Sequence, residues 1–329
     1  LGSWLVHHYG SREVGRRTFY FIVVTNFANA LAPNALWLTG IALCSGLAYA
    51  TTNIAMNSQG VLVEQAIGKS FLPKGHGAWS VGTLLAAVVS SVAAPYCTPR
   101  QALLVVDLLC IVGFYVTTRD LLPSQYDDRP HNDPTQLPRN ERIPRATLKF
   151  LLLIATGQWL GLFAEISVGD WSSVLLHEHF TVPIGPNGYG FAAFMLVQLT
   201  VRLLSPRIID KHSLRHVVRT CAWIGAAGYT IFLNLAIVVS HTSSTMALVF
   251  SCLMYAFIAV GVAAMPAAFS SAAGRIPGLP SARALMVAGI WMAIVNVAGR
   301  MLFSYTAQRV GLPMALEVMG LATVLAGVM

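Results

Sequence analysis

The sequence is poor in charged residues. They make up 10% of its 329 positions, whereas hydrophobic residues make up 56%, and the mean hydropathy is +0.65. Soluble domains carry about a quarter charged residues, so this chain has too little polar surface for a soluble protein of its length. The net charge of +8 therefore does not indicate nucleic-acid binding, and basic loops beside a membrane explain it better.

The sequence also lacks the motifs of enzymes and metal sites. Its five cysteines lie singly, mostly in apolar runs, and form no Cys-x-x-Cys pair. Isolated cysteines of this kind are typical of small buried side chains. No Gly-x4-Gly-Lys-Ser/Thr phosphate loop occurs, and no nucleophile–base or metal-ligand constellation is visible. We therefore expect no enzyme, no metal and no cofactor.

Apolar runs of about 20 residues recur along the whole chain, and runs of this length predict membrane-spanning helices. The sequence therefore predicts an all-α polytopic membrane protein embedded in the lipid bilayer. The predicted spans lie at about 18–37, 40–63, 77–95, 101–118, 148–176, 187–204, 217–240, 245–272, 284–305 and 311–329.

One segment has a different composition. Residues 119–147 contain five prolines and charges of both signs, with no apolar periodicity, which predicts an exposed linker. The linker divides the chain into an N-terminal bundle, residues 1–118, and a C-terminal bundle, residues 148–329.

A spaced motif occurs twice, with every matching pair 203 residues apart. The first copy consists of Gly2, His7, His8, Gly10, Arg12 and Arg16, and the second of Ser205, Asp210, Lys211, Ser213, Arg215 and Arg219. A shared offset indicates two similar halves, and the first copy stands where a second span would end. We therefore expect two pseudo-repeated six-helix bundles, with helix 1 and most of helix 2 missing from this chain.

Basic residues concentrate in alternate connectors. These connectors hold 18 of the 21 Lys and Arg residues and leave only Arg100, Arg300 and Arg309 elsewhere. Because Lys and Arg are enriched in cytoplasmic loops, we expect the linker and both motif copies on the cytoplasmic side of a bacterial plasma (inner) membrane.

The second motif copy resembles the connector signature of the major facilitator superfamily, Gly-x4-Asp-Arg/Lys-x-Gly-x-Arg, with Ser at both Gly positions. The first copy keeps both glycines and Arg12 but has histidines at the Asp and Arg positions. Further stretches resemble the uncharacterised sugar-transporter-like branch related to fucose permease. They run from Asn53 to Gly82, from Glu165 to Ser172 and from Ser270 to Gly278.

The resemblance implies a monomeric secondary transporter that binds a small-molecule solute between its two halves, with H+ as a second partner. Relatives commonly carry an acidic residue where this chain has Asn53. That departure puts proton coupling through this helix in doubt.

Charged residues inside predicted spans are candidate functional groups, because burying a charge in a bilayer is costly. Glu165 lies 16 residues past Lys149, and Arg300 lies 17 past Arg283, so both are expected at similar depth. The sequence predicts that they pair, either as a gate or solute clamp or as a structural ion pair. Asp170 and Trp171 follow near the end of the same span as Glu165. They could belong to a gate, or they could simply lie at the membrane–water interface, where Trp is enriched.

Amide side chains mark one span of the N-terminal bundle. Asn53 and Asn57 are four residues apart and share one helix face, with Gln59 close by. Such amides suit a sugar- or polyol-like solute, although small polar residues also hold membrane helices together. Farther along, Gly261, Ala263, Ala264 and Pro266 predict a kink.

The sequence thus predicts a secondary active or facilitative transporter of a small polar solute, sugar- or polyol-like, working by alternating access. Two alternatives remain open, an efflux transporter for a small amphiphile and a transporter-like membrane sensor without turnover.

Overall fold

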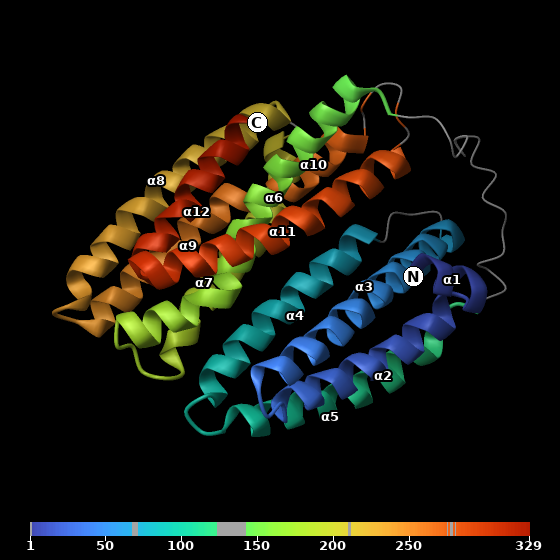
Figure 1. The fold of residues 1–329 in the computed structure, drawn as a ribbon, viewed down its shortest axis with the longest axis horizontal. Coiled ribbons are helices and arrows are strands. Elements are labelled where there is room, and N and C mark those ends of the chain that lie inside the picture. Colours follow the sequence, from blue (N-terminus) through green and yellow to red (C-terminus); the bar gives the residue numbers. More distant parts are fainter. Residues whose placement is uncertain are drawn as a thin grey trace. The chain divides into compact units, whose positions relative to one another are not determined.

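A computed structural model describes residues 2–67, 72–123, 143–209, 212–274, 276, 279 and 281–329. These residues are almost entirely helical, and no strand occurs in the described ranges (Figure 1). The chain divides into two compact units. Unit 1 comprises Leu1–Ser80 and Ala93–Asp133, and unit 2 comprises Val81–Val92 and Pro134–Met329. Most of the predicted linker, residues 124–142, lies outside the described residues.

Unit 1 contains the first helices of the chain. They are α1 (Gly2–Tyr9), α2 (Ser11–Ala30), α3 (Ala35–Ile67), part of α4 (Leu72–Ala93), and α5 (Pro99–Thr117) with the 3-10 turn η1 (Thr118–Asp120). Helix α2 packs against both α3 and α5, and the short α1 packs against α3. Helix α5 begins with a capping box, in which Thr98 and Gln101 exchange hydrogen bonds ahead of the helical run.

Unit 2 holds the longer helical series. Its elements are the rest of α4 (Val81–Val92), α6 (Arg145–Val174), the π-helical turn η3 (Leu175–His179), the 3-10 turn η4 (Pro186–Gly188), α7 (Tyr189–Ile209), α8 (Leu214–Ser240), α9 (Ser244–Val262), α10 (Met265–Gly274), α11 (Ser281–Val310) and α12 (Leu312–Val328). Helix α6 packs against α10, α11 and α12, while α9 packs against α7 and α8. The core of the unit is large and apolar, and Phe194, Tyr229 and Met265 are fully buried within it.

Helices α8 and α9 approach closely because small residues face each other at their crossing. A Cβ atom placed on Gly225 would lie 2.6 Å from the Cα atom of Gly261, a distance that real side chains do not tolerate. In a bilayer, helices associate through this kind of close van der Waals packing, because lipid removes the hydrophobic drive between them. The two glycines therefore set how near α8 and α9 lie.

Six described segments are long and apolar enough to cross a membrane. They are Ala35–Gly60, Pro99–Asp120, Arg145–His179, Leu214–Ser240, Ser244–Val262 and Val287–Val310. Two further apolar helices, Ala78–Ala93 and Leu312–Val328, are shorter. The prediction of an all-α polytopic membrane protein is thus confirmed.

Two predicted spans differ from the observed helices. The span expected at 18–37 is α2, which starts at Ser11 and ends at Ala30. Arg12, Arg16 and Arg17 therefore lie in a helix rather than in a connector. The span expected at 245–272 is divided into α9 and α10 by a turn at residues 263–264. The kink predicted there is confirmed, and Pro266 explains it because proline offers no N–H to continue the helix.

Candidate functional site

Glu165 forms an ion pair with an arginine near the end of the predicted span 187–204. Its Oε2 atom lies 3.1 Å from the Nη2 atom of Arg202 on α7, and both side chains are mostly buried. The predicted pair between Glu165 and Arg300 is therefore wrong. Equal depth along two helices does not by itself bring two side chains together, because the rotation of each helix decides which neighbour a side chain meets.

Arg202 also reaches the break between α9 and α10. Its Nε atom donates a hydrogen bond to the carbonyl oxygen of Ala263, at 3.4 Å. Turns that interrupt a helix leave carbonyl groups without their usual partners, and a guanidinium can satisfy them. One side chain on α7 thus connects Glu165 on α6 with the interrupted helix. Arg202 did not stand out in the sequence because the predicted span ends at residue 204, whereas α7 continues to Ile209 and holds Arg202 well inside the helix.

Arg300 pairs with Asp170 instead, and this pair joins α11 to α6. The two side chains keep 48% and 37% of their surface exposed. A cavity of about 60 Å³ lies beside them. Its lining consists of Phe163, Ser167, Asp170, Trp171, Arg300, Phe303 and Ser304. Two predicted site residues, Asp170 and Trp171, therefore share a cavity with a third, Arg300.

Aromatic rings form a wall beside this charged pair. The ring of Phe303 on α11 lies 5.8 Å from that of Phe163 and 5.7 Å from that of Trp171, measured between centroids. One turn earlier on α6, the ring of Trp159 lies 5.3 Å from that of Phe163. Offset and edge-on rings at these separations attract one another, so the wall holds α6 against α11 while one side of Trp171 borders the cavity.

Polar residues continue along α11 from Arg300. Ser304 and Gln308 follow at intervals of four residues, so they lie on the same side of the helix. Together with Arg300, Met301 and Tyr305, they line a shallow hollow of about 380 Å³. From Arg300 to Gln308 this stripe spans nine residues, a rise of about 12 Å along the helix. Of these three polar residues, only Arg300 was predicted from the sequence, although the four-residue spacing of Arg300, Ser304 and Gln308 indicates a shared helix face.

In unit 1, the predicted amide stripe on α3 is present. The Nδ2 atom of Asn57 donates to Oδ1 of Asn53 at 2.7 Å and to its carbonyl oxygen at 2.9 Å. Asn53 is exposed and Asn57 is half-buried. Both amides thus present polar atoms on one face of α3.

Gln59 lies elsewhere and is only 3% exposed. Its Nε2 atom donates to Oγ of Ser11 at 2.7 Å and to the carbonyl of Leu122 at 3.1 Å, and its Oε1 atom accepts from the Leu122 backbone N–H. These bonds tie α3 to the start of α2 and to the segment after η1. Because its amide is already used within unit 1, we do not retain Gln59 among the solute-binding residues.

The first motif copy has structural reasons for its glycines. Gly10 separates α1 from α2 with φ of 79°, a conformation that favours glycine. A Cβ atom on Gly2 would lie 2.8 Å from the Ile54 side chain and 3.3 Å from the Thr51 Cα atom, so α1 approaches α3 closely there. Arg12 donates from Nη2 to the carbonyl of Arg119 at 3.1 Å, which links α2 to the turn η1 that follows α5.

In the second motif copy, Ser213 caps α8 by accepting a hydrogen bond from the His216 backbone at 3.3 Å. Arg215 is exposed in the first turn of that helix. Asp210 and Lys211 lie outside the described residues. The structure therefore shows the helix cap that this motif provides, while the role of Asp210 and Lys211 stays a prediction.

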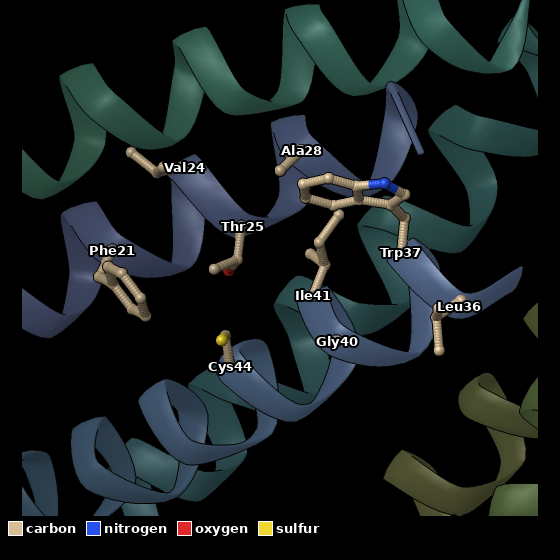
Figure 2. A pocket seen from close by; sticks show the side chains of 9 residues that line it. All are labelled: Phe21, Val24, Thr25, Ala28, Leu36, Trp37, Gly40, Ile41 and Cys44. Atoms are coloured by element: carbon tan, nitrogen blue, oxygen red, sulfur yellow. The ribbon is translucent and has the colours of Figure 1, made fainter. Parts of the chain in front are cut away.

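An apolar groove of about 440 Å³ lies between α2 and α3. Figure 2 shows its lining, Phe21, Val24, Thr25, Ala28, Leu36, Trp37, Gly40, Ile41 and Cys44, with Thr25 and Cys44 facing each other from the two helices. The Thr25 hydroxyl donates to the Ile22 carbonyl within its own helix. The groove therefore offers little to a polar solute, and the charged cavity of unit 2 is the better candidate site.

The chain was compared with known proteins. No protein-family model matches it. It is 24% identical over 323 residues to an uncharacterized transporter of Sinorhizobium fredii, a match that covers 97% of this chain and 80% of that relative. It is also 29% identical over 169 residues to an uncharacterized MFS-type transporter of Yersinia pestis, covering 51% of this chain and 41% of that relative. Neither name gives a substrate or supports the branch related to fucose permease. This polytopic all-helical chain is therefore similar along nearly its whole length to one transporter, and over about half of its length to another that is of the major facilitator type.

Proposed function

We propose that this protein is a secondary transporter that moves a small polar solute, sugar- or polyol-like, across a bacterial plasma membrane. The observation that carries the proposal is the half-exposed Asp170–Arg300 pair on helices that are apolar enough to span a bilayer. Charges at such positions are too costly to face lipid, and they therefore mark a water-filled cavity or pathway. The similarity to transporters supports the same conclusion.

The chemistry beside the pair suits a solute with many hydroxyl groups. A carboxylate accepts hydrogen bonds and a guanidinium donates several, while Ser304 and Gln308 continue the polar surface. The Trp171 ring supplies an apolar face for the carbon skeleton of a sugar. The Asn53–Asn57 stripe provides comparable amides in the other unit. In this proposal the solute binds near the membrane midplane and the two halves expose it alternately to each side.

The charge pattern of the sequence supports an orientation with the linker and both motif copies in the cytoplasm. The protein is proposed to act as a monomer, and the resemblance to the branch related to fucose permease makes neutral sugars the first solutes to test. Because no nucleotide-binding loop occurs in the sequence, the energy source is a gradient of the solute itself or of H+.

Uptake into lipid vesicles that contain the purified full-length protein tests this function. The probes are radiolabelled aldohexoses, deoxyhexoses and sugar alcohols, each measured with and without a pH gradient. We expect at least one of them to enter well above protein-free vesicles. Arg300→Ala should reduce that uptake at least tenfold, because the site loses its positively charged hydrogen-bond donor and Asp170 loses its ion-pair partner.

Arg309→Ala is the matched control. Arg309 lies nine residues farther along α11, where its guanidinium stacks over the Tyr305 ring at 5.3 Å. Its removal should leave uptake within about twofold of the unchanged protein, since it lies outside the charged cavity. Binding of a probe without its movement would contradict the transporter and favour a sensor. Equal losses in both variants would contradict the assignment of the site.

A further inference from the structure

The exposed side of α8 changes its character along the helix. Arg215, Arg219 and Trp223 follow one another at four-residue intervals, so they lie on one side of the helix, and all three are exposed. Farther along, Ile231 and Val238 are exposed apolar residues. The other side of α8 packs against α9 and α12. The exposed side is therefore cationic near its start, aromatic at the third turn and largely apolar beyond it.

The length of α8 indicates how these residues lie in a bilayer. The helix has 27 residues, from Leu214 to Ser240, and is about 40 Å long at a rise of about 1.5 Å per residue. The hydrocarbon core of a bilayer is about 30 Å thick, so about 10 Å of the helix extends into the headgroup region. Because charged side chains avoid hydrocarbon, Arg215 and Arg219 are the residues that lie among the headgroups. Trp223 then lies at the boundary, where tryptophan is enriched.

The two arginines have no counter-charge among the described residues. Neither side chain forms a hydrogen bond or an ion pair within those ranges. The acidic residues in the described part of unit 2 are Glu165, Asp170, Glu178 and Glu317. Three of them are bonded to side chains other than these arginines, and Glu178 belongs to η3. The start of α8 thus carries hydrogen-bond donors that lack an anionic acceptor.

Two guanidinium groups one helical turn apart suit a phosphate group. Each presents parallel N–H donors that match two phosphate oxygens, which is why arginine is favoured where phosphate is bound. His216 is exposed beside Arg215, with its ring centroid 6.3 Å from that of His212, and it can donate a further hydrogen bond. These side chains together can surround one phosphate group at the surface of the membrane.

The continuation of the exposed side favours a phosphate that belongs to a lipid. From Trp223 to Val238 the helix rises about 22 Å, which is more than the thickness of one hydrocarbon leaflet, about 15 Å. The exposed Trp223, Ile224 and Ile231 can therefore contact the length of an acyl chain. A zwitterionic headgroup would bring its own cation close to the arginines, whereas an anionic headgroup would not. Charge complementarity thus selects an anionic phospholipid.

We propose that the exposed side of α8 is a binding site for an anionic phospholipid. The lipid phosphate accepts hydrogen bonds from Arg215 and Arg219, and one acyl chain lies along Trp223 and Ile231. The bound lipid neutralises the cationic start of α8 and anchors it at the membrane surface. The charged cavity of unit 2 is lined by α6 and α11 instead, so this site does not depend on the proposed solute transport.

Trp223 serves as the reporter of this site. The full-length protein is placed in vesicles of phosphatidylglycerol and phosphatidylcholine, one of which carries bromine atoms on its acyl chains and quenches nearby tryptophan fluorescence. The difference between the unchanged protein and Trp223→Phe isolates the signal of Trp223. We expect phosphatidylglycerol to be preferred at least fivefold, because each arginine beside an anionic headgroup contributes about fivefold in affinity. Equal quenching of Trp223 by the two lipids would overturn the proposal.

Paired substitutions separate this site from a general effect of surface charge. Arg215→Gln combined with Arg219→Gln should abolish the preference for phosphatidylglycerol. The matched control, Arg145→Gln combined with Lys149→Gln, removes two exposed charges from the start of α6 and should leave the preference within about twofold. Equal losses in both double variants would contradict a site on α8. If the α8 double variant loses its helical structure, Arg219→Gln alone should lower the preference about fivefold.

Soluble phosphates decide whether the ligand is a lipid. Inorganic phosphate and glycerol 3-phosphate at millimolar concentration should leave the quenching of Trp223 by brominated phosphatidylglycerol unchanged, because they lack an acyl chain. Loss of that quenching with either compound would show a site for soluble phosphate and would contradict the lipid. Solute uptake is not measured in these experiments, so a negative result here leaves the proposed transport function intact.

Discussion

The Glu165–Arg202 pair allows a quantitative test of how much one buried ion pair stabilises unit 2. The proposed changes are Glu165→Gln, Arg202→Met and the double variant. Exposed ion pairs contribute about 0–1 kcal/mol, whereas removing one partner of a buried pair costs about 3–5 kcal/mol. The two side chains retain 15% and 29% of their exposure, so we expect about 2 kcal/mol for the unpaired charge that remains in each single variant.

Arg202→Met also removes the hydrogen bond to the Ala263 carbonyl, which adds about 1 kcal/mol. Its total cost should be about 3 kcal/mol, against about 2 kcal/mol for Glu165→Gln. The double variant leaves no unpaired charge, so it should cost only about 1 kcal/mol for the lost hydrogen bond, against about 5 kcal/mol for the sum of both single variants. The resulting coupling energy is about 4 kcal/mol, somewhat above the usual range for side chains in direct contact.

The measurement is unfolding by a denaturing detergent in mixed micelles, followed by tryptophan fluorescence, for all four proteins of the cycle. The matched control is the Glu13–Arg17 pair on α2, whose atoms are 2.7 Å apart but whose side chains are 41% and 72% exposed. Glu13→Gln and Arg17→Met should show a coupling of only about 0.3–0.5 kcal/mol. A coupling for Glu165 and Arg202 no larger than that of the control would refute the reasoning from burial.

Three further predictions concern packing and backbone conformation. Gly225→Ala should lower the thermal midpoint of unfolding and cost about 1–3 kcal/mol, because its Cβ atom would meet the backbone of Gly261 at 2.6 Å. The control is Gly40→Ala, where a Cβ atom would meet nothing within 4 Å. It should be neutral or slightly stabilising in the same thermal scan. Gly10→Ala should cost about 1–2 kcal/mol by detergent unfolding, since φ of 79° is unfavourable for residues with a Cβ atom; an unchanged midpoint would contradict the conformation of that turn. Gln59→Leu should make the segment after η1 more sensitive to limited proteolysis, because the bonds that tie it to α3 are lost; equal cleavage rates would contradict that role.

The helices themselves could largely be predicted from the sequence, because helix formation in apolar runs depends on local properties. A run of apolar residues forms a helix wherever water is excluded, since all its backbone groups must then be bonded within the segment. The same holds for the Asn53–Asn57 stripe, whose four-residue spacing is a property of any α-helix. The break near Pro266 is local as well, because the missing N–H belongs to that residue.

The partners of the charged and amide side chains were decided only by the tertiary structure. Glu165 meets Arg202 rather than Arg300, and Gln59 bonds to Ser11 and Leu122 rather than facing a solute. Helical periodicity places each of these residues on a face of its own helix, but it does not say which neighbour that face meets. That depends on the rotation and crossing of packed helices, which many distant contacts determine together. The sequence alone thus determined the helices and their apolar lengths, and packing determined the site.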